Sequence, residues 1–157
     1  MEEKQITEIL SKVERYCRYQ ERCKYEVEKK LIELEVPEKT KKSILDELAE
    51  KKYFDNNRYS YEYAVGKLRN NKWGKIKIRY HLKCKYIEKG VIDNALKKIP
   101  SSEYTSVFNK MAKKEWVNKS NMDSSSRKRR FINTLKSRGW EFYLINSFLL
   151  ETRENML

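Results

Sequence analysis

Residues 76–86, IKIRYHLKCKY, decide the fold, because two periodicities compete within them. Apolar and polar side chains alternate strictly along this segment, which is the pattern of a half-buried β-strand. On a helix, the same residues place Ile78, Leu82 and Tyr86 on one stripe that could face a core. A lone strand has no neighbour with which to pair its backbone, so the choice between the two depends on the rest of the chain.

The rest of the chain contains two further copies of this region. Leu31, Leu82 and Leu135 superpose when the chain is aligned on itself with offsets of 51 and 53 residues. Mostly apolar residues then fall at positions −4, +5, +9, +13 and +14 from each leucine. They are Val27, Val36, Thr40, Ile44 and Leu45; Ile78, Ile87, Val91, Ala95 and Leu96; and Phe131, Trp140, Leu144, Phe148 and Leu149. This spacing is typical of two amphipathic helices joined by a tight turn, so residues 76–86 are predicted to be helical.

Each helix pair has room for one more helix before it, and apolar stripes of helical period occupy that room. The chain holds only four Gly and two Pro, which is too few for the turns of a β-sandwich or barrel. We therefore predict an all-α fold of three tandem three-helix repeats that form an elongated, curved array. The predicted upstream helices cover 5–20, 57–70 and 102–117, and the predicted repeats are 1–54, 55–100 and 101–157.

Two details of the predicted turns and one exposed face follow from this alignment. Gly139 lies in the turn of the third copy, where a helix C-cap is expected, and Pro37 starts the second helix of the pair in the first copy. If 76–86 is a helix, Ile76, Tyr80 and Cys84 form a second apolar face. We expect that face to pack against a neighbouring unit rather than to stay open for a partner.

The positive charge of the chain is concentrated in its last two thirds. The formal net charge is +13. Residues 1–54 carry 13 basic and 13 acidic side chains, residues 55–100 carry 12 and 4, and residues 101–157 carry 11 and 6. General solubility would not require such segregation, so we predict a polyanionic partner, with nucleic acid as the first candidate.

Several other classes of protein fit the sequence poorly. No apolar run approaches the roughly 18 residues of a membrane span, and the acidic N-terminus lacks a signal-peptide core. Three scattered cysteines suggest a reduced, cytoplasmic protein without disulfides. His81 is the only histidine, so no triad or zinc-hydrolase site is expected. Cys17, Cys23, His81 and Cys84 could nominally bind zinc, but their spacing does not match a zinc knuckle, and we expect no metal or cofactor.

Four motifs resemble those of the RecX family of recombination regulators. They are ELAEKKYFDNNRYS at 47–60, KWGKIKI at 72–78 followed by Leu82, Arg138-Gly139-Trp140, and Arg22-Cys23. The resemblance extends over about residues 12–150. The chain departs from the family pattern at Cys23, where Ser is usual, at Asn56, where a second acid is usual, and at Tyr86, where Gly is usual.

The resemblance implies an elongated, all-helical, three-repeat modulator of the RecA recombinase. Proteins of this family are understood to lie in the groove of the RecA–DNA filament and usually to suppress its ATPase, strand-exchange and coprotease activities. We accordingly expect a non-catalytic, monomeric regulator whose partners are RecA, the RecA–ssDNA filament and the DNA phosphate backbone. The alternative is a free-standing, sequence-nonspecific nucleic-acid-binding protein built from helix-turn-helix-like units.

Three groups of cations are candidates for contact with the filament or nucleic acid. The middle unit carries six cations within fourteen residues and no acid among them, although a solvated helix face is the alternative interpretation. A second run sits in a predicted first helical turn, where cations oppose the helix dipole; simple solubility is its alternative explanation. Arg138 comes from the closing family motif. The candidates are Lys72, Lys75, Lys77, Arg79, Lys83 and Lys85; Arg127, Lys128, Arg129 and Arg130; and Arg138.

Overall fold

The structure is a computed structural model that describes residues 1–155, and every regular element in that range is an α-helix. This confirms the all-α prediction. In chain order the helices are α1 (Glu3–Tyr19), α2 (Lys24–Glu33), α3 (Glu38–Glu50), α4 (Asn56–Asn71), α5 (Lys75–Lys83), α6 (Lys89–Lys97), α7 (Ser101–Asn118), α8 (Ser124–Ser137) and α9 (Phe142–Glu154).

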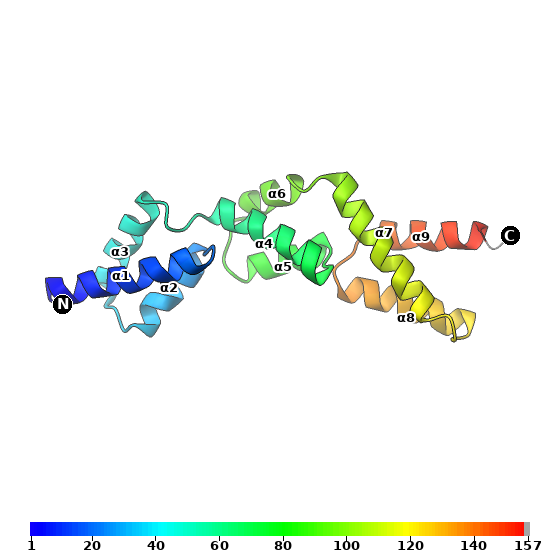
Figure 1. Cartoon of the computed structure of the whole chain (residues 1–157), viewed down its shortest axis with the longest axis horizontal. Helices are drawn as coiled ribbons and strands as arrows, with labels where there is room; N and C mark the ends of the chain where they lie inside the picture. The colour runs from blue at the N-terminus through cyan, green and yellow to red at the C-terminus, as the bar shows by residue number, and fades with distance from the viewer. Residues whose placement is uncertain (156–157) are drawn as a thin grey trace.

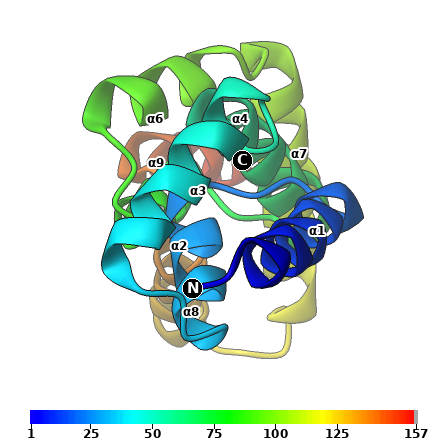
Figure 2. The ribbon, with the colours of Figure 1, turned by 90° about the vertical axis from the view of Figure 1, so that its left-hand side faces the viewer.

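The helices follow one another in groups of three along an elongated molecule. Figure 1 shows α1–α3 at one end, α4–α6 in the middle and α7–α9 at the other end, with the two termini far apart. Viewed along the long axis, the groups overlie one another (Figure 2). Sequentially adjacent groups are therefore spatial neighbours, as in other repeat arrays.

Residues 76–83 of the ambiguous segment belong to α5, which settles the choice between strand and helix. Ile78 and Leu82 are fully buried, and the equivalent Leu31 and Leu135 are fully buried too, as the alignment predicted. The prediction for Tyr86 was wrong: its side chain is 80% exposed. The reason is that α5 ends at Lys83, so Tyr86 lies in the following turn and not on the helical stripe.

The expected packing of the second apolar face of α5 was also wrong. Ile76 and Tyr80 are 55% and 64% exposed, and Cys84 is exposed. The last group packs at the N-terminal end of α5 and the first group packs just beyond its C-terminal end, so neither covers this side of the helix. Single exposed apolar side chains are common on protein surfaces, and this face alone identifies no partner.

The turn after the second helix of each group has the same backbone geometry in all three groups. Four residues after the aligned leucine, Glu35, Tyr86 and Gly139 have positive φ values of 56°, 56° and 83°. The next residue donates its N–H to the carbonyl of the leucine, at 3.1, 3.4 and 3.2 Å, respectively. This is the Schellman arrangement, and it confirms Gly139 as a helix C-cap. In the first two groups the same turn is made without glycine.

The buried apolar side chains form two clusters rather than three. One cluster lies within residues 13–54 and holds Leu31 and Leu48. The other runs through both remaining groups, from Tyr59 to Ile145, and also includes Cys23. The middle and last groups thus share one continuous core, whereas the first group has its own.

The shared core is closed by a direct backbone contact between α5 and the end of α8. Gly74 N–H donates to Arg138 O at 2.8 Å, and Ile76 N–H donates to Gly139 O at 3.1 Å. A Cβ at Gly74 would lie 2.3 Å from Gly139 O, and a Cβ at Gly139 would lie 2.3 Å from Lys77 N. Both glycines are therefore needed for this approach.

Leu82→Ala should lower the free energy of unfolding by about 2–5 kcal/mol, because it opens a cavity in the shared core. Urea denaturation followed by circular dichroism would measure the loss. Ile76→Ala on the exposed side of the same helix is the matched control and should cost less than about 0.5 kcal/mol. Equal losses would contradict the assignment of the buried stripe.

Gly74→Ala should cost at least about 2 kcal/mol, because the added methyl group meets the backbone of Gly139. Its own φ of −80° and ψ of 167° suit any residue, so steric approach alone causes the loss. Gly90 lies in the first turn of α6 with nothing within 4 Å of a built Cβ. Gly90→Ala should be neutral or stabilising by up to about 1 kcal/mol in the same denaturation assay.

Candidate polyanion-binding surface

Two of the predicted cations on α5 lie against aromatic rings. Lys75 Nζ is 4.6 Å from the ring centroid of Tyr104, and Lys77 Nζ is 4.5 Å from that of Trp73. Both side chains are half-buried. Cation–π contacts of this kind hold the ammonium groups near the surface in fixed positions, where they remain partly accessible.

Two other predicted cations of the middle group form partly exposed ion pairs with acids of this chain. Arg79 is bonded to Asp93, and this hydrogen bond holds the pKa of the Asp93 carboxyl below its ordinary value. Lys85 Nζ lies 3.1 Å from Glu26 Oε1 of α2. These charges are already balanced, in contrast to the exposed Lys83 at the end of α5.

The basic run at the start of α8 divides into one structural residue and three exposed ones. The guanidinium of Arg127 lies 3.9 Å from the ring centroid of Trp116 and donates to Trp116 O at 2.7 and 3.2 Å. Lys128, Arg129 and Arg130 are exposed. Arg127 therefore fastens α8 to α7, whereas the next three cations remain available to an anionic partner.

Lys72 and Arg138, although 66 residues apart, line one cleft. The cleft has a volume of about 330 Å³ and lies where the end of α4 and the end of α8 meet α7. Two lysines that the sequence analysis did not select, Lys110 and Lys114, complete its basic lining. We call it the basic cleft. Its lining residues are Lys72, Ser106, Val107, Lys110, Met111, Lys114, Glu115 and Arg138.

The single carboxylate of the basic cleft is neutralised by neighbouring cations. Glu115 lies 2.6 Å from Lys119 Nζ and 3.5 Å from a guanidinium nitrogen of Arg138. Arg138 also contacts Met111 Sδ at 3.5 Å, so its side chain is held at the cleft wall. Lys110 and Lys114 form no ion pair within the part of the chain that the structure describes. The cleft thus carries excess positive charge.

The backbone at Lys72 is fixed by the contact between the middle and last groups. Lys72 adopts the left-handed conformation, with φ 57°, as the C-cap of α4. Its carbonyl accepts a hydrogen bond from Trp140 Nε1 at 3.0 Å. A non-glycine residue in this region is strained, and such strain is frequent at functional positions.

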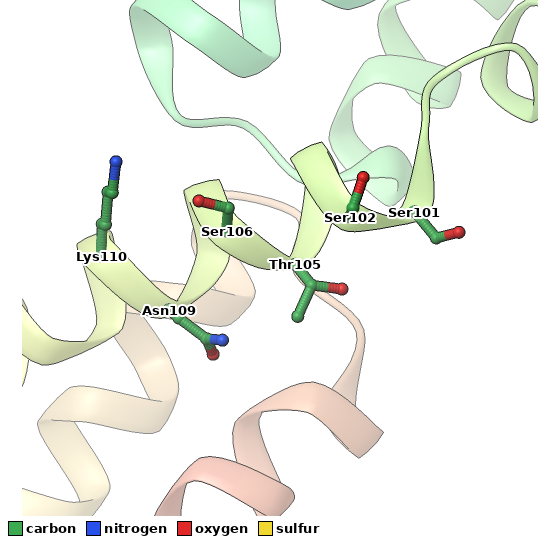
Figure 3. Close-up of a pocket in the computed structure, with 6 residues that line it drawn as sticks. All are labelled: Ser101, Ser102, Thr105, Ser106, Asn109 and Lys110. Carbon is green, nitrogen blue, oxygen red and sulfur yellow. The ribbon is translucent and has the colours of Figure 1, made fainter.

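A shallow hydroxyl-rich hollow continues from the basic cleft along α7. Its lining residues are Ser101, Ser102, Thr105, Ser106, Asn109 and Lys110. In Figure 3 the side chains of Ser102, Ser106 and Lys110 project from the same side of α7. Ser106 and Lys110 also line the cleft, so hydroxyl donors and ammonium groups share one continuous surface. Such a surface can bind phosphate or carboxylate oxygens.

Comparison with known proteins shows the family. A model described as the second three-helix domain of RecX matches residues 55–96. Regulatory protein RecX of Clostridium acetobutylicum is 32% identical over 130 residues, which are 80% of this chain and 60% of that protein. Its counterpart in Limosilactobacillus reuteri DSM 20016 is 28% identical over 149 residues, with 89% and 56% covered. The chain belongs to the RecX family.

Solved structures with RecX names share the fold. A crystal structure of regulatory protein RecX is 25% identical, with a TM-score of 0.81 over 90% of this chain and 70% of that one. The crystal structure of RecX from Lactobacillus salivarius is 20% identical, with a TM-score of 0.82 over 93% of this chain and 95% of that one. The chain spans 56–60% of the length of the curated RecX proteins named above, so it matches only part of each.

Two further observations bear on other kinds of site in this RecX-family chain. Within residues 1–155, no group of three or more His, Cys, Asp and Glu side chains could hold a metal ion, so Cys17, Cys23, His81 and Cys84 are not brought together. None of the described helices has the length and apolar character needed to cross a membrane.

The lysines of the basic cleft escaped the sequence analysis because they do not form a run. Phe108 and Met111 define the buried side of α7, and Lys110 and Lys114 lie one helical turn apart on its polar side. A helical projection of α7 could have found that pair. Their meeting with Lys72 and Arg138 depends on tertiary structure, which no linear pattern reveals.

Arg127→Ala should lower the free energy of unfolding by about 1–2 kcal/mol, because it removes a charge-assisted hydrogen bond and a cation–π contact. Arg130→Ala, three residues later and exposed, should change it by less than about 0.5 kcal/mol. Thermal denaturation of the two variants side by side would test this difference. If Arg127→Ala left the thermal stability unchanged, the whole run 127–130 would be surface charge.

Proposed function

We propose that this RecX-family chain is a non-catalytic regulator that binds the RecA–ssDNA filament and lowers its ATPase, strand-exchange and coprotease activities. The family match over four fifths or more of the chain carries the proposal. The basic cleft adds a surface suited to an anionic partner. The chain acts as a monomer in the cytoplasm, and its repeats are 1–54, 55–100 and 101–157.

The physical basis of inhibition is a series of weak contacts along an elongated body. A filament repeats its subunits at regular intervals, and a long array can touch several of them at once. Each contact contributes little, but their combined effect holds neighbouring RecA subunits in one arrangement. Bridging neighbouring subunits restrains their relative motion, and we propose that this restraint slows ATP turnover without any chemistry by the regulator.

The cations of the proposed interface suit phosphate contact better than base reading. The basic cleft presents three lysines and one arginine, and lysine acts as a point charge without the fixed geometry that base edges require. Contacts to phosphate position a protein on DNA and carry no sequence information. We infer that Lys83 and the exposed cations of α8 extend the same interface. Arg79, Lys85 and Arg127 instead make contacts within the protein, to Asp93, Glu26 and Trp116 respectively.

The alternative function, free-standing binding of nucleic acid, is favoured by the same cleft, because a bare strand also offers phosphates. The two functions differ in their response to salt. Binding through phosphates alone weakens steeply as counterions compete. Binding to a protein–DNA filament retains a salt-resistant part from protein–protein contacts.

The test is co-sedimentation with RecA–ssDNA filaments, alongside bare ssDNA and free RecA, together with the filament ATPase. Lys110→Glu combined with Lys114→Glu should weaken filament binding at least about tenfold, because it places two acids in the basic cleft. Thermal stability should change little, since exposed charges contribute little to folding. Lys4→Glu with Lys12→Glu, two exposed lysines of α1, is the matched control and should bind nearly normally.

Each other outcome has a definite meaning. If the two double substitutions weakened filament binding equally, the basic cleft would not be part of the interface. Binding to bare ssDNA as tight as binding to the filament, and lost with salt, would favour the alternative function. Normal filament binding with an unaltered ATPase would contradict the proposed regulation.

A further inference from the structure

The two joints between consecutive groups use equivalent positions but different chemistry. We call the contact of α4–α6 with α7–α9 the second joint, where Gly74 meets Gly139. Gly74 lies eight residues before Leu82, and Gly139 lies four residues after Leu135. Counting in the same way, the first joint, between α1–α3 and α4–α6, pairs Cys23 with Tyr86.

The second joint is closed by the backbone itself. The first N–H groups of α5 have no partner within their helix, and three of them are satisfied across the joint. Two donate to the carbonyls of Arg138 and Gly139, and Lys75 N–H donates to Tyr104 Oη at 2.9 Å. Trp140 is 1% exposed and fills the interface. Few rearrangements can occur there without breaking buried hydrogen bonds.

Side chains close the first joint instead of backbone groups. Cys23 N–H donates to Glu26 Oε2 at 3.3 Å, within its own group, and Lys24 N–H donates to Asn56 Oδ1 at 2.9 Å. Within residues 1–155, no backbone–backbone hydrogen bond links 1–54 to the residues that follow. The side chains at 23 and 86 stand where the second joint has none, so the same backbone approach is blocked.

The carboxylate of Glu26 makes two contacts across the first joint. Glu26 Oε1 accepts from Tyr59 Oη at 3.3 Å and from Lys85 Nζ at 3.1 Å, while the ring centroids of Tyr25 and Tyr86 lie 5.3 Å apart. A hollow of about 280 Å³ remains beside these groups. A second ion pair, Arg58–Glu21 at 2.7 Å, is partly exposed. An exposed ion pair of this kind contributes little to holding two parts together, so the part-buried contacts of Glu26 are the main polar link across the joint.

The positions of the two buried apolar clusters agree with this difference in chemistry between the two joints. The second joint lies inside one continuous core, whereas the first joint separates two cores and is crossed by Cys23 and the partly buried Tyr25. Interfaces that are small and polar permit relative motion of the parts they join. We propose that the first joint is a hinge on which α1–α3 turns, while α4–α9 moves as one rigid body. The glycine pair at the second joint, and its replacement by Cys23 and Tyr86 at the first, set this difference.

Double electron–electron resonance measures the distances between nitroxide spin labels and can compare the two joints directly. Lys39, Asn94 and Asn146 are exposed, and each lies in a different group. Labels at 39 and 94 report on the first joint, and labels at 94 and 146 report on the second. Cys84→Ser removes the exposed thiol. Cys17 and Cys23 are buried, and burial raises the pKa of the Cys17 thiol to about 11, so both resist labelling.

The distance distribution across the first joint should be about twofold wider than that across the second. Glu26→Gln should widen it further, because it weakens the contacts of Glu26 with Tyr59 and Lys85. The matched control is Glu141→Gln, which alters the contact of Glu141 with Tyr104 Oη at the second joint. It should leave the second distribution unchanged, because the backbone hydrogen bonds remain.

The results distinguish an open hinge, a latched hinge and no hinge. A distribution that is narrow in the parent chain and wide in Glu26→Gln supports a hinge latched by that carboxylate. The proposal is overturned if the distance distribution across the first joint is as narrow as that across the second, both in the parent chain and in Glu26→Gln. It is also overturned if the distribution across the second joint is as wide as that across the first. The measurement needs no RecA or DNA, so it is independent of the proposed function.

Discussion

The close approach of Gly74 and Gly139 is the contact on which the arrangement of the last two groups depends. The N-terminus of α5 has unpaired N–H groups, and the C-terminus of α8 has unpaired carbonyls. Joined end to end, each satisfies the other, and their dipoles align favourably. The hydrogen bonds of 2.8 and 3.1 Å are possible because neither residue carries a Cβ.

The same contact creates the basic cleft. The carbonyl of Arg138 accepts from Gly74 N–H, and the carbonyl of Lys72 accepts from Trp140 Nε1. Backbone bonding at these residues brings their side chains to one place on α7, where Lys110 and Lys114 are already present. The fold and the candidate site are therefore not separable, since a substitution that opened the joint would also disperse the cations.

The repeat made most of the fold predictable, and the limits of that prediction have physical causes. Aligning Leu31, Leu82 and Leu135 outweighed the alternation within residues 76–86, because a buried position must recur in every copy. The error at Tyr86 arose because glycine marks this turn in the third group alone. A Schellman turn can hold a non-glycine residue at a cost of about 1–2 kcal/mol, and the surrounding contacts then fix its geometry. Glycine-based turn rules miss such a position in this sequence, although the family pattern, in which Gly is usual at position 86, and the alignment with Gly139 both point to it.

The candidate site was predicted less well, because the number of cations in a segment does not give the charge that a partner meets. Arg79 and Lys85 look available in the sequence, yet each is paired with an acid from another helix. Arg127 is bound to Trp116. Once these are set aside, the remaining cations of the candidate surface are those of the basic cleft, those of the exposed part of α8, and Lys75, Lys77 and Lys83 of α5. Bringing like charges together there opposes folding unless an anion compensates, and this cost is the physical reason to look for a polyanion at the cleft.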